Sequence, residues 1–147
     1  MRYINQTEYN QVIGQLLEIE NLCFGKEAAW RDDDFAVVLD QSNCIGVICE
    51  IESMIGAYVF YQVSPGEVDI LNLAVRPCLQ RKGFGAKIIG RLKERFPTQK
   101  LIAYVRESSL DTQLFFRSQG FKCVGIVEDY FEHPEENCYL FVWSTDG

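Results

Sequence analysis

The most informative segment of the sequence is Asn72-Leu73-Ala74-Val75-Arg76-Pro77 followed by Gln80-Arg81-Lys82-Gly83-Phe84-Gly85-Ala86. The apolar run of residues before Pro77 ends at that proline. After Gly83 and Gly85, apolar residues recur at helical spacing in an amphipathic segment. This pattern predicts a strand, a tight loop and a helix N-terminus. The first turn of a helix has free backbone N–H groups and the positive end of the dipole, and glycine lets a phosphate approach them. Because Arg81 and Lys82 add positive charge, the stretch predicts a pyrophosphate-binding site.

Its spacing excludes two commoner phosphate-binding motifs. The pattern Gly-x-x-x-x-Gly-Lys-Ser/Thr of nucleotide-hydrolysing P-loops is missing, and Ile88 stands where a dinucleotide-binding fold requires its third glycine. One structural alternative stays open, in which Gly83 and Gly85 serve only the packing of a helix start.

The rest of the chain predicts an α+β fold. The expected order is β-α-α-β-β-β-α-β-α-β-β, which gives a mixed, mostly antiparallel central sheet with flanking helices in a single domain, 1–147. Thr7 is the expected N-cap of the first helix, a loop is expected at Phe24-Gly25, and Gly120 is expected to end the last helix. Strands are expected at 1–6, 44–52, 54–63, 67–75, 101–105, 122–131 and 138–143, and helices at 7–22, 30–39, 83–96 and 110–119.

Composition limits the partners of the protein. The chain has 147 residues and a net charge of −7, which disfavours nucleic acid and suits cationic partners such as amines, although solubility alone explains it equally well. No run is long and apolar enough to cross a membrane, and the N-terminus has no apolar signal core. We therefore expect a cytoplasmic protein without a membrane or nucleic-acid partner.

The cysteines predict neither a metal site nor disulfides. No Cys-x-x-Cys pair occurs among the six cysteines, and His133 is the single histidine, so no bound metal is expected. Free thiols are the simplest interpretation, and a cysteine nucleophile paired with His133 is disfavoured because no catalytic signature surrounds any of them. Four cysteines in strand-like segments are expected to be small core residues: Cys44, Cys49, Cys123 and Cys138.

The opening stretch resembles the core motif of the GNAT superfamily of N-acetyltransferases. That motif reads Gln/Arg-x-x-Gly-x-Gly/Ala after a strand that ends in Ala-Val-x-Pro. A second similarity follows in Val105-Arg106 and in the run 115–121, Phe-Phe-Arg-Ser-Gln-Gly-Phe. Within the superfamily the chain is most similar to RimI-like enzymes, which acetylate protein N-terminal amines. The resemblance implies a GNAT fold along nearly the whole chain and acetyl-CoA as co-substrate.

The resemblance also implies which residues bind acetyl-CoA. Backbone N–H groups of the glycine loop would bind its pyrophosphate, and the end of the preceding strand would offer backbone groups to its pantetheine arm and acetyl carbonyl. A donor at that carbonyl stabilises the developing oxyanion. Ser109 stands where relatives carry an asparagine. The implied cofactor-binding residues are Leu73, Ala74, Val75, Arg81, Lys82, Gly83, Phe84, Gly85, Ala86 and Ser109.

The residues at the expected acid and base positions differ from those of the family. Phe116 stands where many relatives carry a tyrosine acid, and it has no proton to donate. Tyr104 replaces a glutamate of RimI-like enzymes and is the candidate acid, unless it only packs in the core. Asp69 lies six residues before Val75, where histone-type members carry a catalytic glutamate, so it is the candidate base unless it is merely a solvated strand residue.

Three aromatic residues are candidates for the acceptor site. Phe24 and Trp30 flank the early loop that covers the acceptor in relatives, and Tyr130 lies in a segment resembling the substrate mouth of RimI-like proteins. The predicted activity is acetyl transfer to a primary amine, with a protein N-terminus among the candidates. A small, polyamine-like amine and a non-catalytic CoA-binding module are the alternatives. The sequence leaves the oligomeric state open, a dimer included.

Overall fold

The computed structural model describes residues 1–146, which form one seven-stranded sheet with helices on both faces. The order of elements agrees with the predicted one, with a single turn of 3₁₀ helix added before the third α-helix. The strands are β1 (Arg2–Ile4), β2 (Cys44–Ile51), β3 (Met54–Ser64), β4 (Glu67–Val75), β5 (Lys100–Arg106), β6 (Lys122–Glu132) and β7 (Glu135–Trp143). The helices are α1 (Gln6–Ala28), α2 (Asp32–Asp40), η1 (Pro77–Leu79), α3 (Phe84–Arg95) and α4 (Leu110–Ser118).

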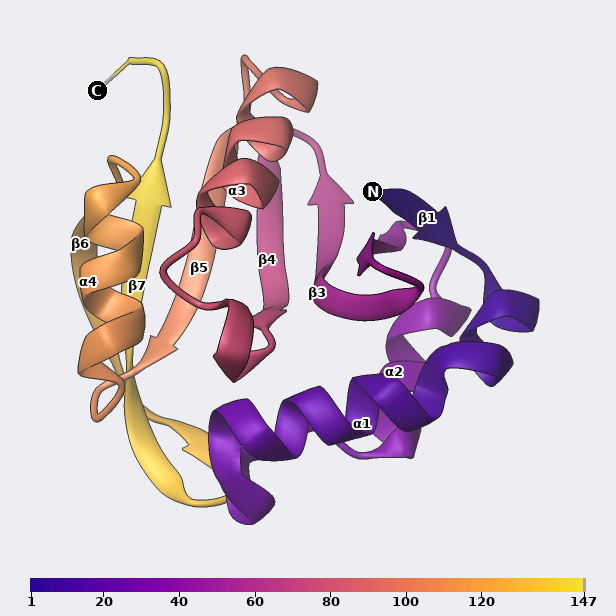
Figure 1. Cartoon of the computed structure of the whole chain (residues 1–147). Coiled ribbons are helices and arrows are strands. Elements are labelled where there is room, and N and C mark those ends of the chain that lie inside the picture. The colour runs from indigo at the N-terminus through magenta and orange to yellow at the C-terminus, as the bar shows by residue number, and fades with distance from the viewer. Residues whose placement is uncertain (147) are drawn as a thin grey trace.

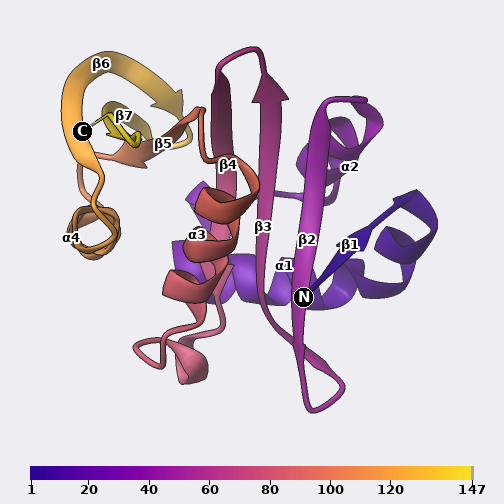
Figure 2. The same cartoon turned by 90° about the horizontal axis from the view of Figure 1, so that it is seen from above.

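The sheet is mixed and mostly antiparallel, as predicted. Its strand order is β1-β2-β3-β4-β5-β7-β6, and of the neighbouring pairs only β4 and β5 run parallel. That pair is joined by a crossover through α3, which a parallel connection requires. Seen from above, β2, β3 and β4 stand side by side, whereas β5, β7 and β6 curl away from them (Figure 2).

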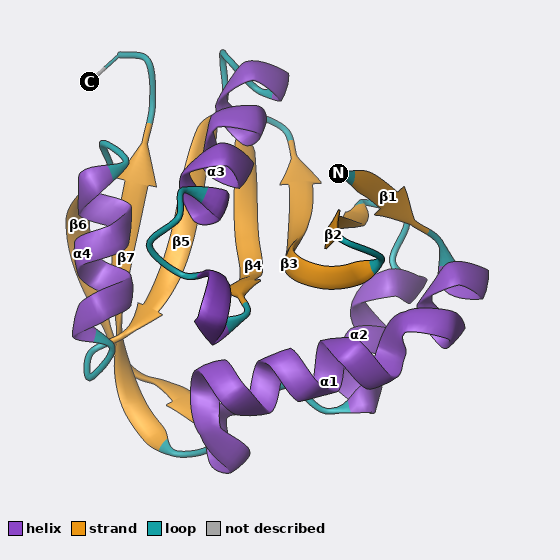
Figure 3. Ribbon diagram, in the orientation of Figure 1, coloured by secondary structure: helices purple, strands orange, loops and turns teal. Residues whose placement is uncertain are grey.

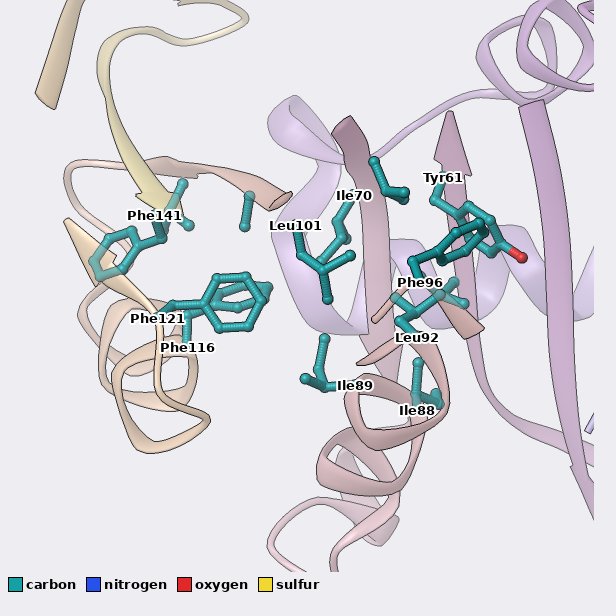
Figure 4. Close-up of a cluster of buried hydrophobic side chains, with 14 of the residues drawn as sticks. Tyr61, Ile70, Ile88, Ile89, Leu92, Phe96, Leu101, Phe116, Phe121 and Phe141 are labelled. Atoms are coloured by element: carbon teal, nitrogen blue, oxygen red, sulfur yellow. The ribbon is translucent and has the colours of Figure 1, made fainter. Parts of the chain in front are cut away.

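Alternation along β3 divides the core into two clusters. Val59 and Tyr61 pack in the cluster that α3 and α4 cover, and Tyr58 and Phe60 pack in the cluster that α1 and α2 cover. Successive strand residues point to opposite faces, so a strand covered on both sides reads as a nearly continuous apolar run. Figure 4 shows the first cluster, where α3 side chains meet those of the sheet.

Four local expectations were wrong. Asn5, not Thr7, caps α1, because its side chain accepts the Glu8 N–H at 2.9 Å. No loop interrupts the chain at Phe24-Gly25; α1 continues through a kink at Gly25, where φ is 77°. Cys123 is exposed because β6 is an edge strand. The last strand begins at Glu135 and not at Cys138, so the polar loop at His133 is only a short turn.

We expect Leu101→Ala to lower the free energy of unfolding by about 2–5 kcal/mol, because it leaves a cavity in the cluster under α3. Leu101 is 0% exposed there. The control is Leu114→Ala on α4, where the side chain is 51% exposed and the change should stay within about 0.5 kcal/mol. Urea unfolding monitored by circular dichroism measures both, and equal losses would contradict this description of the core.

Candidate active site

β4 and β5 separate halfway along their length. Their paired residues end at Ile70 and Ala103, so beyond them β4 has an edge that β5 does not cover. At the same point β4 has a bulge against β3, because Phe60 pairs with Asn72 and Tyr61 with Ile70, which leaves Leu71 as the extra residue. A bulge of one residue reverses the faces to which later side chains point. Ile70 therefore packs toward α3, whereas Asn72 faces α1.

The uncovered edge of β4 presents backbone groups to the opening. Arg76 N donates to Gly56 O of β3 at 2.8 Å, so the Val75 carbonyl, on the other side of that peptide, faces away from β3. This carbonyl accepts the Gln80 side-chain amide at 2.9 Å and the Cys23 thiol at 3.2 Å. Because alternate residues of a strand orient their backbone groups alike, the N–H groups of Leu73 and Val75 point into the same opening.

The glycine loop lies at the far end of this edge, between η1 and the first turn of α3 (Figure 3). The first helical bond of α3 runs from Lys87 N to Gly83 O at 3.0 Å, so the N–H groups before it have no helical acceptor. Gly83 has a φ of 90°, which only glycine adopts freely, and nothing lies within 4 Å of the place where a Cβ would be. A Cβ on Gly85 would lie 3.0 Å from the Phe115 ring, so this glycine does serve packing against α4.

A cleft of about 460 Å³ lies on the α1 side of the opening. Its walls are the segment between α1 and α2, the separated strands β4 and β5, and the turn between β6 and β7, which Figure 1 shows near the C-terminal end of α1. Five of the sequence-predicted residues line it: Phe24, Trp30, Leu73, Tyr104 and Ser109.

The other predicted residues lie outside this cleft. Asp69 and Tyr130 belong to a cluster behind Tyr104, and Val75 and Ala74 continue the β4 edge toward the glycine loop Arg81–Ala86. The loop and the cleft are thus two parts of one site that are joined along β4. Four acidic residues and His133 also line the cleft, the acidic ones being Glu20, Glu27, Asp33 and Asp34.

Asp69, Tyr104 and Tyr130 interact with one another on the face of β4 and β5 opposite α3. Burial, and then the charge of Glu67, raise the pKa of Asp69, while the Tyr104 hydroxyl acts in the opposite direction. Burial and the Asp69 carboxylate together raise the pKa of Tyr104 to about 12. The Tyr130 ring stacks on Tyr104 with centroids 5.4 Å apart. Oδ1 of Asp69 is buried and has no hydrogen-bond partner among residues 1–146, so it retains capacity to accept a proton.

Comparison with known proteins identifies the family. The family model for the acetyltransferase (GNAT) family matches residues 13–121, which include β2 to β5, the glycine loop and α4. The chain belongs to the GNAT acetyltransferase family. The family predicted from the loop motif is thereby confirmed.

Three proteins similar to this GNAT chain share 31% identity with it or less. It is 31% identical over 94 residues to the uncharacterized N-acetyltransferase YvbK of Bacillus subtilis, a match that covers 60% of this chain and 59% of that relative. Two solved structures have the same fold. The ribosomal-protein-S18-alanine N-acetyltransferase of Escherichia coli has a TM-score of 0.81 at 20% identity, over 99% of this chain and 94% of that one. NAA60 of Arabidopsis thaliana, in complex with acetyl-CoA, has a TM-score of 0.76 at 15% identity, over 99% and 98%.

Phe116 of this GNAT chain is a core residue. It is 4% exposed and packs against Phe121 with ring centroids 5.0 Å apart. Its ring also reaches the cleft wall, where it offers only carbon. A proton donor in this cleft must therefore come from another element, and Tyr104 of β5 is the titratable candidate nearest the separated strands.

Sequence reasoning missed two residues of the site. Glu20 of α1 is 0% exposed and lies at the cleft. It could have been found in the sequence as a charged residue on the apolar helix face that includes Leu16 and Ile19. Arg106 stacks on Phe131 at 4.3 Å and donates to the carbonyls of His133 and Pro134, so it holds the β6–β7 turn over the cleft. No local pattern could have indicated that role.

Two classes of feature are absent from residues 1–146. No helix there is both long and apolar enough to span a membrane. Over the same residues, no group of three or more His, Cys, Asp or Glu side chains is arranged to hold a metal ion.

We expect Gly83→Ala to destabilise the protein by about 1–2 kcal/mol, because an L-residue at this φ is strained even where space is free. The matched control is Gly90→Ala on the same helix, where φ is ordinary and a Cβ meets nothing within 4 Å. That change should stabilise the helix by about 0.5–1 kcal/mol. Thermal unfolding distinguishes the two, and shifts of the same sign would contradict the strain at Gly83.

Proposed function

We propose that this GNAT chain transfers the acetyl group of acetyl-CoA to a primary amine. One observation carries the proposal: a loop of unpaired backbone N–H groups and a substrate-sized cleft are joined by an uncovered strand edge. The glycine loop can bind the pyrophosphate of CoA, and the uncovered β4 edge can bind the amides of its pantetheine arm. The cleft can hold the amine that accepts the acetyl group. The NAA60 complex with acetyl-CoA, a protein of the same fold, supports this assignment.

The residues present fit acetyl-CoA. The N–H groups from Arg81 to Ala86 are the donors for the pyrophosphate, at the positive end of α3. The Leu73 N–H is the donor for the acetyl carbonyl, since it faces the opening and Leu73 also lines the cleft. Ser109 precedes α4 with its side chain free of any capping bond, so its hydroxyl is available to the cofactor.

The proposed proton path runs through Tyr104 to Asp69. A neutral amine attacks the acetyl carbon, a C–N bond forms, and the C–S bond to CoA breaks. The surplus amine proton passes to the Tyr104 oxygen as the Tyr104 proton passes to Asp69, and the same path in reverse returns it to the departing thiolate. The raised pKa of Asp69 favours its acceptance of a proton. The pKa of Tyr104, about 12, keeps this residue protonated between turnovers.

A protein N-terminus is the acceptor class we favour. The Escherichia coli structure that shares this fold is named for acetylation of the alanine of ribosomal protein S18, and Tyr130, which stacks on Tyr104 of the cleft wall, is 48% exposed. A small polyamine-like amine is the second candidate, because Glu27, Asp33 and Asp34 line the cleft with negative charge. Arg31 lies among them and offsets part of that charge, which favours an acceptor that is not a polycation.

We expect calorimetry to show binding of acetyl-CoA by the wild type and by Gly90→Ala, and weaker binding by Gly83→Ala, which distorts the loop. A panel of N-terminal peptides and polyamines, with free CoA as readout, then tests transfer. Asp69→Asn and Tyr104→Phe should each lower kcat by about 10²-fold or more, as expected of groups that transfer protons. Binding without transfer to any amine would instead identify a non-catalytic CoA-binding module.

The rate should also depend on pH through Asp69. Only ionised Asp69 accepts a proton, and its raised pKa means that this form is lost, as pH falls, at a higher pH than the ordinary aspartate value of about 3.9. We therefore expect kcat/KM to rise with pH through that raised pKa. Asp69→Asn should abolish this limb and keep the one caused by ionisation of the amine. An unchanged profile in Asp69→Asn would show that the carboxylate takes no part.

A further inference from the structure

Glu20 is a carboxylate enclosed by hydrogen-bond donors from three other segments. It is fully buried on α1, and burial is the main cause of its raised pKa. Oε1 accepts the backbone N–H of Trp30 at 2.7 Å, and Oε2 accepts the Asn72 side-chain amide at 2.7 Å. The Tyr58 hydroxyl also donates to Oε2. A buried carboxyl group is tolerated only where such donors replace water.

Two of these donors belong to opposite walls of the cleft. Trp30 lies in the segment that follows the Gly25 kink, and its ring packs against Phe35 and Phe60 with centroids 5.1 and 6.1 Å apart. Asn72 lies on β4, directly between the bulged Leu71 and Leu73, whose N–H faces the opening. One carboxylate therefore links the acceptor wall to the part of β4 nearest the separated strands.

Glu20 cannot itself take part in proton transfer with a substrate. It has no exposed surface, and both of its oxygens are already occupied by donors of the protein. Its hydrogen bonds act on the position of other groups, namely the Trp30 backbone and the Asn72 side chain. This distinguishes it from Asp69, whose Oδ1 has no such partner.

We propose that Glu20 is a positioning residue that sets the separation between the acceptor wall at Trp30 and the β4 edge at Asn72 and Leu73. The inference rests on the proposed acetyl transfer, because it assigns Glu20 a role in where the amine sits relative to the acetyl carbon. Its effect falls on the alignment of the acceptor with the acetyl carbonyl near Leu73. Glu20 makes no hydrogen bond to the glycine loop, where we place the pyrophosphate, so the affinity for acetyl-CoA should depend on Glu20 only weakly.

Two tyrosine hydroxyls of the cluster under α1 and α2 offer a matched test. The Tyr58 hydroxyl donates to Glu20 beside the cleft, whereas the Tyr9 hydroxyl donates to Asp32 at 2.5 Å, away from it. Both rings are buried in the same apolar cluster, so Tyr58→Phe and Tyr9→Phe each remove one hydroxyl bound to a carboxylate. Glu20→Gln keeps the side-chain volume and one carbonyl acceptor for Trp30, and it loses the second acceptor.

We expect Glu20→Gln to raise KM for the amine or lower kcat, changing kcat/KM by about tenfold, as for the loss of one hydrogen bond to a charged group. Tyr58→Phe should act in the same direction with a smaller change. Tyr9→Phe should keep wild-type kinetics, and all three variants should bind acetyl-CoA within about twofold of the wild type. Hydrogen exchange of the Trp30 amide should accelerate in Glu20→Gln and not in Tyr9→Phe, because the neutral Gln oxygen accepts that N–H more weakly than the Glu20 carboxylate does.

Kinetic parameters of Glu20→Gln and Tyr58→Phe that match those of Tyr9→Phe would overturn the inference, and so would unchanged exchange at Trp30. If Glu20→Gln does not fold, the comparison of Tyr58→Phe with Tyr9→Phe decides it alone. Failure of the proposed function is a different result, because the wild type itself would then transfer acetyl to no amine. In that case the exchange rate at Trp30 still tests whether Glu20 holds the segment.

Discussion

The extra residue at Leu71 is the constraint on which the site depends. Pairing of β4 with β5 stops at Ile70, so beyond it the β4 backbone groups that face away from β3 have no strand partner. The bulge also turns Asn72 from the α3 face to the α1 face, where it meets Glu20. A regular strand at this place would close the opening and direct Asn72 into the cluster under α3. Both the edge for the cofactor and the link to the acceptor wall thus follow from one residue.

Two carboxylates near this bulge, the buried Glu20 and the half-buried Asp69, differ in what they can do. Burial raises the pKa of both, but Glu20 is surrounded by three donors while Asp69 interacts with one, the Tyr104 hydroxyl. A fully hydrogen-bonded buried group rigidifies its surroundings, whereas a carboxylate with an unused acceptor can still take up a proton. This contrast is the physical reason for assigning position to Glu20 and proton transfer to Asp69.

Sequence patterns predicted the elements and the glycine loop, because both depend on local spacing of apolar residues, glycine and proline. They did not predict the kink at Gly25 or the exposure of Cys123, which depend on how α1 and β6 meet the rest of the chain. Asp69 was chosen by its distance from Val75, but the bulge between them places Asp69 behind Tyr104 and not at the cleft. The alternation of apolar and polar residues along β4 does not indicate that Leu71 is an extra residue relative to β3.

Replacement of the family tyrosine by Phe116 has a structural consequence for the chemistry. Phe116 gains a place in the aromatic packing beneath α4, beside Phe121. In the mechanism we propose, the acid and base groups come from the sheet instead, and the pair, Asp69 and Tyr104, lies on adjacent parallel strands. Asp69 is paired with β3 and β5, and Tyr104 is paired with β7, so both shift less than loop residues would and a proton path built on them keeps its geometry. The proposed acceptor side, in contrast, is made of a kinked helix end and a turn, which are held by the few contacts made by Glu20 and Arg106.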